Sequence, residues 1–338
     1  MEMEGHGARG TAMARLTFRL AAAVLTVVLA TLAIHAAVSW LPGDPLAPFV
    51  RRGSLARLDA EERAALEHRF GLDRPLVERW GLWVTRALGG DLGRSLRSAR
   101  PVAAEIGARL GPTVELNVVA TLLAVILGVP LGWWSAHRPG GAADRIGGAM
   151  TLALYALPYF WLALILQHVF AIRLGWLPLY GRTPATEGAG LGGHVLHLVL
   201  PATSLALHMI AFYARFARGA ALEGLTAGSA RLARALGLPE PRILLRHGIT
   251  PSLVPLATLF GLLLPALASG SVLVETIFSW PGLGSLFVTA LLSRDLPVVM
   301  ALASLTVVLT VAGSLAADLL VLAADPRRRP AGVRGIAT

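Results

Sequence analysis

Six stretches of this chain consist almost entirely of apolar residues, and each is long enough to cross a lipid bilayer. They cover residues 20–40, 116–136, 146–172, 194–213, 252–274 and 296–317, and none contains an Arg, Lys, Asp or Glu. A membrane-crossing helix needs about 20 such residues, whereas a barrel strand is about 10 residues long and alternates in polarity. Because the bilayer offers no water to the backbone, a segment of this length forms a helix. The pattern predicts an all-α polytopic membrane protein with six transmembrane helices, too many to be buried helices of one soluble fold.

The polar segments between these stretches divide the chain into parts. We expect an N-terminal tail (1–19), a first transmembrane helix (20–40), a long helical loop (41–111), a five-helix core (112–322) containing a polar loop at 217–250, and a basic tail (323–338). Within the long loop, Asp59 and Glu62 have the spacing of a capping box, and an amphipathic helix is predicted to end at Gly89-Gly90. Residues 1–12 are polar and unpatterned, so Met13 is an alternative start to Met1.

The distribution of arginine predicts the orientation. All 30 basic residues are Arg. With the N-terminus in the cytoplasm, fifteen of them lie in predicted cytoplasmic segments and only Arg173, Arg182 and Arg294 lie in the two short outer loops. The other twelve lie in the long loop, which exceeds the roughly 60 residues over which the positive-inside rule operates. We therefore expect both termini in the cytoplasm and the 41–111 loop outside, with the net charge of +10 serving membrane orientation rather than nucleic-acid binding.

The missing residue types exclude several activities. Without Lys the chain has no P-loop and no Schiff-base lysine. Without Cys it has no disulfide or cysteine-bearing metal site. His194 and His197 have the spacing of metal ligands, but no third ligand is near them in the sequence, and we expect no metal. An intramembrane hydrolase built on His168, His208 and Glu275 would need a nucleophile or a complete metal set. The chain is therefore expected to be a non-catalytic membrane subunit without a cofactor of its own.

Several short strings follow one another at characteristic spacings. They are residues 41–45 (LPGDP), 70–75 (FGLDRP), 90–95 (GDLGRS), 113–116 (TVEL), 158–161 (PYFW) and 175–178 (GWLP), followed by a signature segment, residues 275–297, that contains Trp280, Pro281, Gly282, Gly284, Arg294 and Asp295. Together they resemble permeases of the dipeptide/oligopeptide/nickel class of bacterial ABC importers, in the family of binding-protein-dependent transport systems. The resemblance covers about residues 15–327.

The polar loop at 217–250 resembles the segment through which such permeases couple to their ATPases. The matching positions are Arg231, Ala233, Arg234, Ala235, Gly237, Leu238, Arg246 and His247, while Leu232 stands where a polar Thr is common. Small alanines let a short helix lie close to a partner, and glycine permits a left-handed turn. Two arginines three residues apart lie on one side of that helix, where they can meet carboxylates of the partner. The alternative is an ordinary basic loop that only fixes orientation.

A further set of residues is a candidate path or gate. Proline kinks are expected in the third and fifth predicted spans, and polar side chains within spans prefer a cavity or a partner to lipid. An interhelical hydrogen bond is an equal alternative for each polar side chain. The set comprises Asn117, Pro158, Gln167, His168, His208, Gly261, Pro265 and Glu275.

The resemblance implies a multi-pass permease of the bacterial inner membrane. Its partners would be a second homologous permease, two cytoplasmic ATPase subunits that carry ATP and Mg²⁺, and an extracytoplasmic substrate-binding protein. Dipeptides or oligopeptides are the expected substrates, because the sequence contains no concentrated acidic cluster or three-histidine set for a naked Ni²⁺. Nickel, glutathione or another small solute are the alternatives within the family.

Overall fold

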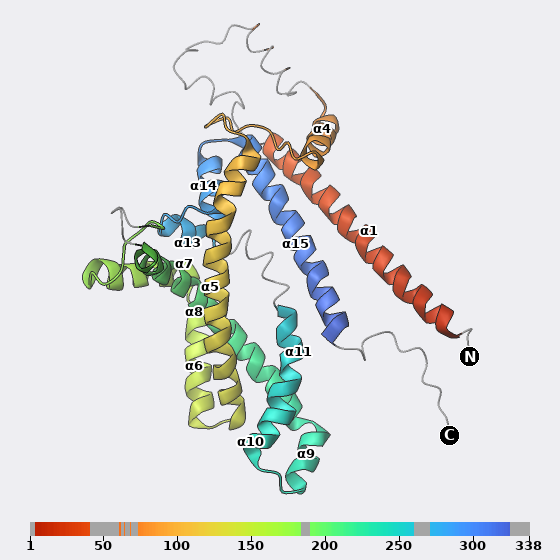
Figure 1. Cartoon of the computed structure of the whole chain (residues 1–338), viewed down its shortest axis with the longest axis vertical. Helices are drawn as coiled ribbons and strands as arrows, with labels where there is room; N and C mark the ends of the chain where they lie inside the picture. The colour runs from red at the N-terminus through yellow and green to blue at the C-terminus, as the bar shows by residue number, and fades with distance from the viewer. Residues whose placement is uncertain are drawn as a thin grey trace. The chain divides into compact units, whose positions relative to one another are not determined.

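The computed structural model describes residues 4–40, 74–183, 190–259 and 271–324, with 61, 64 and 68 as single positions. Within these ranges the side chains of residues 4–16, 254–255, 257–258 and 320–324 are not described. The elements of the described residues are all helices, and a single isolated bridge joins Arg94 to Pro101. The predicted all-α class is therefore confirmed for this part of the chain (Figure 1).

The chain folds into two compact units. The first comprises Met1–Gly111 and Gly282–Val311, and the second comprises Pro112–Pro281 and Ala312–Thr338. Two long helices, α5 (Val102–His137) and α15 (Leu296–Ala324), contribute to both. We describe each unit separately.

The first unit is built around α1 (Glu4–Ser39), α4 (Leu76–Leu88) and α14 (Leu283–Leu292). The helix predicted to end at Gly89-Gly90 is confirmed as α4, which ends at Leu88 with Gly89 as its cap. Its apolar face lies against α1, where Trp80 Nε1 donates to Thr31 Oγ1 at 3.1 Å. The ring of Trp83 lies 4.8 Å from that of His35. At least this part of the long loop is thus packed onto the first membrane helix.

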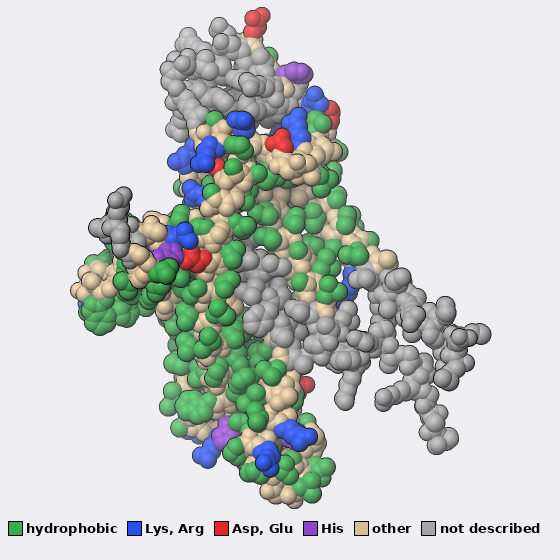
Figure 2. Space-filling model, viewed as in Figure 1, with side chains coloured by type: hydrophobic (Ala, Val, Ile, Leu, Met, Phe, Trp, Pro, Cys, Tyr) green, Lys and Arg blue, Asp and Glu red, His purple; other side chains and the backbone are tan. Residues whose placement is uncertain are grey.

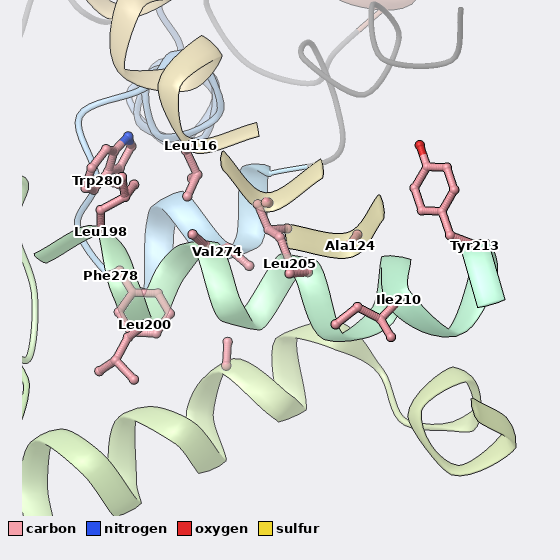
Figure 3. Close-up of a cluster of buried hydrophobic side chains, with 14 of the residues drawn as sticks. Leu116, Ala124, Leu198, Leu200, Leu205, Ile210, Tyr213, Val274, Phe278 and Trp280 are labelled. Carbon is pink, nitrogen blue, oxygen red and sulfur yellow. The ribbon is translucent and has the colours of Figure 1, made fainter. Parts of the chain in front are cut away.

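The second unit packs the long helix α8 (Gly190–Thr226) against α5, α6 (Ala142–Ala156) and α7 (Tyr159–Leu166). Its largest buried cluster includes Leu116 of α5, Leu205 of α8, and Val274 with Phe278 near α13 (Val272–Ile277) (Figure 3). Of these side chains, Leu116 and Val274 lie more than 150 residues apart in the sequence. The core therefore joins the second predicted span to the start of the signature segment.

The crossing of α5 and α8 is unusually close because two glycines lie on it. A Cβ atom added to Gly128 would lie 2.7 Å from the carbonyl oxygen of Ile210, and one added to Gly132 would lie 2.2 Å from that of Ala214. No real Cβ atom tolerates such distances. Small residues four apart let the backbones of membrane helices approach in this way.

The number of membrane spans is lower in the described residues than the sequence predicts. Four helices are long and apolar enough, at Thr17–Ser39, Val102–His137, Gly190–Thr226 and Leu296–Leu319, and a bent pair raises the count to five. The predicted span at 252–274 is described only at its ends, by α11 (Thr250–Leu259) and α13. The count of six therefore stays a prediction. Gly261 and Pro265, the string at 41–45 and the capping box at Asp59 and Glu62 lie outside the described residues.

The predicted span at 146–172 is not one continuous helix, which corrects the expectation of a mere kink. α6 ends at Ala156 and α7 begins at Tyr159, with a bend of 95° between them. The ring of Pro158 disfavours helical backbone in the residue before it, and Leu157 is accordingly extended, at φ −81° and ψ 131°. A π-helix, η1 (Gln167–Arg173), continues α7. One proline thus splits an apolar stretch whose hydropathy gives no sign of the break.

Candidate functional site: the signature segment and the coupling segment

The signature segment begins inside the protein rather than on its surface. Trp280 is fully buried, and its Nε1 donates to the carbonyl of Pro112 at 2.8 Å. Its backbone N–H donates to the carbonyl of Glu275 at 2.8 Å, which closes the end of α13. The carbonyl of Phe278 accepts a hydrogen bond from the N–H of Gly181 at 2.8 Å. This part of the segment ties α5, α13 and the connection before α8 together.

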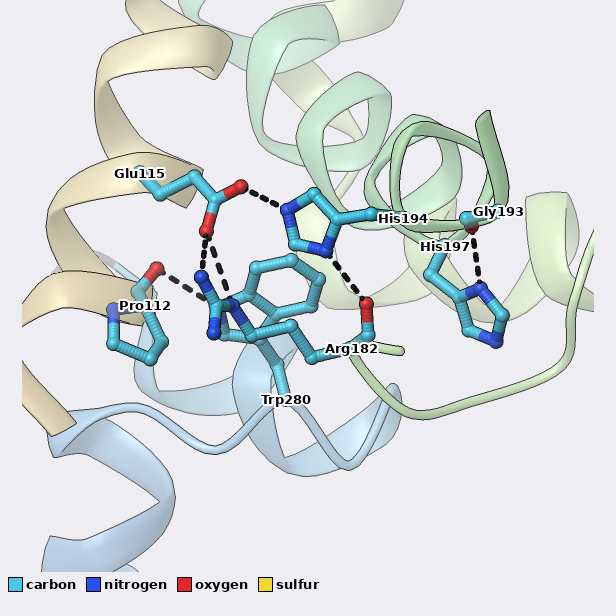
Figure 4. A network of polar contacts seen from close by, with 7 residues as sticks. All are labelled: Pro112, Glu115, Arg182, Gly193, His194, His197 and Trp280. Atoms are coloured by element: carbon cyan, nitrogen blue, oxygen red, sulfur yellow. Dashed lines mark hydrogen bonds and ion pairs between the residues drawn. The ribbon is translucent and has the colours of Figure 1, made fainter. Parts of the chain in front are cut away.

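A polar network surrounds Trp280 (Figure 4). Arg182 donates to one carboxylate oxygen of Glu115 through Nε at 3.1 Å and Nη2 at 2.7 Å. His194 Nε2 pairs with the other oxygen of Glu115, and His194 Nδ1 contacts the carbonyl of Arg182 at 3.0 Å. The guanidinium of Arg182 lies 5.9 Å from the centre of the Trp280 ring. One carboxylate thus connects α5, the connection after η1 and the start of α8.

The two histidines considered as metal ligands do not converge. His194 is bound to Glu115, whereas His197 Nδ1 contacts the carbonyl of Gly193 on its own helix at 2.9 Å. In the described residues no group of three or more His, Cys, Asp or Glu could hold a metal ion.

Two candidate path residues, Asn117 and Glu275, lie in a second buried network. Glu275 is fully buried, and one of its carboxylate oxygens accepts from Thr113 Oγ1 at 2.9 Å and from Ser271 Oγ at 2.7 Å. Asn117 Nδ2 donates to Ser271 Oγ at 3.0 Å and to the carbonyl of Thr113 at 2.9 Å. Both side chains therefore form hydrogen bonds between α5 and the α13 region. Such interhelical hydrogen bonds are the alternative that the sequence analysis gave to a role in the path.

The remaining path candidates are spread along the broken span and α8. Pro158 caps α7 at the break. Gln167 Nε2 donates to the carbonyls of Leu179 at 2.9 Å and Ile277 at 3.4 Å. His168 is exposed on η1. His208 lies on α8 against two tyrosines from either side of the break.

The end of the signature segment belongs to the first unit, where Asp295 is almost fully buried. Its carboxylate accepts from Ser95 Oγ, from the N–H of Leu96 at 2.9 Å and from the N–H of Arg97 at 3.2 Å. The string at 90–95 is therefore held by the signature segment, 200 residues away.

The other signature residues shape the backbone around α14. Pro281 and Gly282 lead into that helix, Gly284 is buried in its first turn, and Arg294 has a φ of 55° just after its end.

The polar loop at 217–250 contains a compact helical segment, residues 228–249, which we name the coupling segment after the resemblance described above. It consists of α9 (Gly228–Ala235), α10 (Glu240–Ile243) and the π-helix η2 (Leu244–Ile249). Ala230, Ala233 and Ile243 form a small core with the end of α8 and with Ala136 of α5. Gly237 has a φ of 74°, so the predicted left-handed turn after the short helix is confirmed.

The arginines of α9 have different surroundings. Arg234 is engaged within the chain, because Nε donates to Glu240 at 2.8 Å and Nη1 donates to the carbonyl of Leu225 at 3.1 Å. Arg231 is exposed. Leu232 on α9 and Leu236, which caps the C-terminal end of α9, are 61% and 71% exposed. The exposed surface of the coupling segment therefore carries apolar and basic side chains together, and Figure 2 shows both kinds at the α9–α10 end.

The matching residues Arg246 and His247 lie on η2. Arg246 is exposed, whereas the backbone of His247 packs on α8. A Cβ atom on Gly224 would lie 2.0 Å from the carbonyl oxygen of His247, so the two backbones touch at this point. Displacement of η2 would therefore be transmitted directly to α8.

Several pairings in this arrangement were missed from the sequence. The pairs Ser95–Asp295, Thr113–Glu275 and Glu115–Arg182 each join two of the recurring strings or their neighbours. A single sequence shows where such strings occur but not which of them pair. By contrast, Gly128 and Gly132 have the GxxxG spacing typical of close helix packing in membranes. This signal is present in the sequence, although the sequence analysis did not use it.

The helical fold, the apolar spans and the buried signature segment define a membrane transport subunit, and comparison with known proteins gives its family. Residues 128–330 match the family described as binding-protein-dependent transport system inner membrane component. The chain belongs to this family. It is a non-catalytic, multi-pass inner-membrane permease subunit of an ABC importer.

Three curated relatives illustrate the similarity. The chain is 37% identical to the oligopeptide transport system permease protein AppB of Bacillus subtilis, over 85% of this chain and 90% of that protein. It is 36% identical to the di/tripeptide transport system permease protein DppB of Pseudomonas aeruginosa, over 88% and 94%. It is 35% identical to the glutathione transport system permease protein GsiC of Pectobacterium atrosepticum, over 92% and 97%.

Proposed function

We propose that this permease imports short peptides. The observation that carries the proposal is that two of the relatives above are named for oligopeptides and for di- and tripeptides. Glutathione, for which the third relative is named, nickel and other small solutes are the competing substrates within the class. The chain would form half of a translocation path, completed by a second, homologous permease.

The coupling segment would receive an ATPase subunit on its cytoplasmic side. Its free surface presents Leu232 and Leu236, with Arg231 beside them. Exposed leucines on a short helix with an alanine core fit an apolar cleft, and the arginine fits a carboxylate at the rim of that cleft. The close backbone contact between Gly224 and His247 supports transmission of ATPase movement into α8.

The complete importer would contain two permeases, two ATPase subunits that bind ATP and Mg²⁺, and an extracytoplasmic binding protein. For Arg234 we propose a role within the chain in place of the contact with the ATPase that the sequence led us to expect. Its contacts with Glu240 and Leu225 support a role in holding α9 to α10 and α8 rather than in contacting the ATPase.

The substrate is tested by uptake into proteoliposomes that contain the complex of this chain with its co-encoded permease, ATPases and binding protein. Labelled trialanine is expected to accumulate when ATP is present on the ATPase side. Unlabelled dipeptides and tripeptides should compete. Uptake of nickel or of glutathione without uptake of trialanine would refute the peptide hypothesis and leave the family assignment standing.

The proposed contact between the coupling segment and the ATPase is tested by introducing a charge into its exposed surface. Leu232→Glu should reduce co-purification of the ATPase about tenfold or more, because a carboxylate placed in an apolar interface is desolvated. Leu88→Glu is the matched control, since Leu88 is 84% exposed on α4, on the predicted outer side. Equal ATPase recovery from both variants would contradict the assignment.

A further inference from the structure

The break between α6 and α7 lies about halfway through the predicted membrane. Asp144 on α6 and Arg218 on α8 form a two-point ion pair at the predicted cytoplasmic end, with distances of 2.6 and 2.8 Å. At 1.5 Å per residue, Tyr155 and His208 each lie about 15 Å along their helices from that pair. This is half of a hydrocarbon core of about 30 Å.

A cluster of rings and one cation surrounds the break. The ring of Tyr155 stacks on that of His208 with centroids 5.4 Å apart, and the ring of Tyr159 lies 6.4 Å from the same imidazole. The guanidinium carbon of Arg215 lies 5.2 Å from the centre of the Tyr155 ring. His208 Nδ1 is buried, and no described residue forms a hydrogen bond with it. Tyr155 is nevertheless 49% exposed, so the cluster has an open side.

The open side is unsuited to lipid. Interrupted backbone at membrane depth is tolerated only where it is covered by protein or lines a cavity. Imidazole and phenol groups at that depth likewise face a partner or a water-filled space. In the described part of the chain Arg215 has no carboxylate at ion-pair distance, so its charge is available to an anion.

We propose that Tyr155, Tyr159, His208 and Arg215 form a substrate-contact site on the translocation path, which takes the backbone and terminal carboxylate of a short peptide. This inference rests on the proposed peptide function. The tyrosine rings offer apolar faces to varied side chains, and Arg215 pairs with the carboxylate. His208 Nδ1 is buried beside the stacked ring of Tyr155 in this structure, and it bonds a backbone amide once the peptide displaces that ring. His208 and Arg215 lie about 10 Å apart along α8, which is the length of about three extended residues.

The site is tested with single cysteines, because the chain has no native Cys. A small water-soluble methanethiosulfonate reagent is applied to the complete reconstituted importer that carries Tyr155→Cys. Ile126→Cys is the control, since Ile126 is 63% exposed on the apolar face of α5. Its depth in the membrane is similar, because it lies about 15 Å along α5 from Ala136, which packs near the cytoplasmic end of α8. The reagent is expected to modify Tyr155→Cys, to spare Ile126→Cys, and to react several-fold more slowly when trialanine and the binding protein are present.

The outcomes are distinguishable. If Tyr155→Cys is as inert as Ile126→Cys, the surface faces lipid and the proposed site is overturned. If Tyr155→Cys cross-links to the second permease, the surface is an interface and the proposed site is likewise overturned. Modification without protection by trialanine also overturns it if the cysteine-free parent imports trialanine. If the parent imports no peptide, the peptide function itself fails, and the site fails with it.

A second measurement separates substrate contact from a structural role. His208→Leu is expected to lower the maximal rate of trialanine uptake about tenfold, because it removes one hydrogen bond to the substrate. A tenfold change corresponds to about 1.4 kcal/mol. His208→Gln keeps a hydrogen-bonding group and should restore most of that rate. Equal rates in both variants, with unchanged recovery of the complex, would contradict the contact.

Discussion

Replacement of Gly132 by alanine tests the close crossing of α5 and α8. The added Cβ would lie 2.2 Å from the carbonyl oxygen of Ala214 and 2.9 Å from the Cβ of Ala217. A carbon normally lies about 3.3 Å or more from a carbonyl oxygen, so the two helices must separate by about 1 Å. Overpacking of this kind costs about 1–3 kcal/mol, whereas alanine gains about 0.5–1 kcal/mol over glycine in a helix. We expect a net loss of about 1–2 kcal/mol of folding free energy.

The assay is thermal unfolding of the purified complex in detergent, followed by tryptophan fluorescence. Gly128→Ala, whose Cβ would lie 2.7 Å from the carbonyl oxygen of Ile210, should destabilise less than Gly132→Ala. Gly107→Ala is the matched control on the same helix, because no atom lies within 4 Å of its added Cβ, and it should be neutral or stabilising. A Gly132→Ala complex as stable as the Gly107→Ala complex would show that the backbones do not approach as described.

Four further outcomes follow from the contacts. Asp295→Asn should destabilise the complex by about 1.5–3 kcal/mol, since it removes a buried charged acceptor of three hydrogen bonds; an unchanged melting temperature would contradict this. Trp280→Phe should cost about 0.5–1.5 kcal/mol by removing the buried hydrogen bond from Nε1 to the carbonyl of Pro112, and a neutral result in the same melt would argue against the anchor. Gly237→Val should strain the turn by about 1–2 kcal/mol and lower ATPase co-purification at normal membrane yield; full recovery of the ATPase would refute it. In intact cells an impermeant maleimide should label Arg294→Cys and not Arg138→Cys, and the reverse pattern would overturn the orientation.

Local rules in the sequence were sufficient for several elements of the fold. Four of the six apolar stretches correspond to described helices long and apolar enough to cross a membrane, because a bilayer leaves a long apolar segment no alternative to a helix. Gly89-Gly90 correctly ended α4, and Gly237 correctly gave a left-handed turn, because both depend on backbone freedom at one residue. The recurring strings were sufficient to identify the family, which the comparisons confirm.

Pairings between distant segments were decided only by the tertiary structure. Hydropathy could not show that Pro158 splits a span into two helices at 95°, because both halves are equally apolar. The sequence did not show that Arg234 bonds Glu240 of its own chain, because the left-handed turn at Gly237 is what brings α10 back beside α9. The sequence identified Asp295 only as a residue of the signature segment, whereas the structure shows its carboxylate buried against residues 200 positions away. Sequence determines what each residue is able to do locally, whereas packing decides which partner satisfies it, because a buried polar group bonds whichever partner the fold brings within reach.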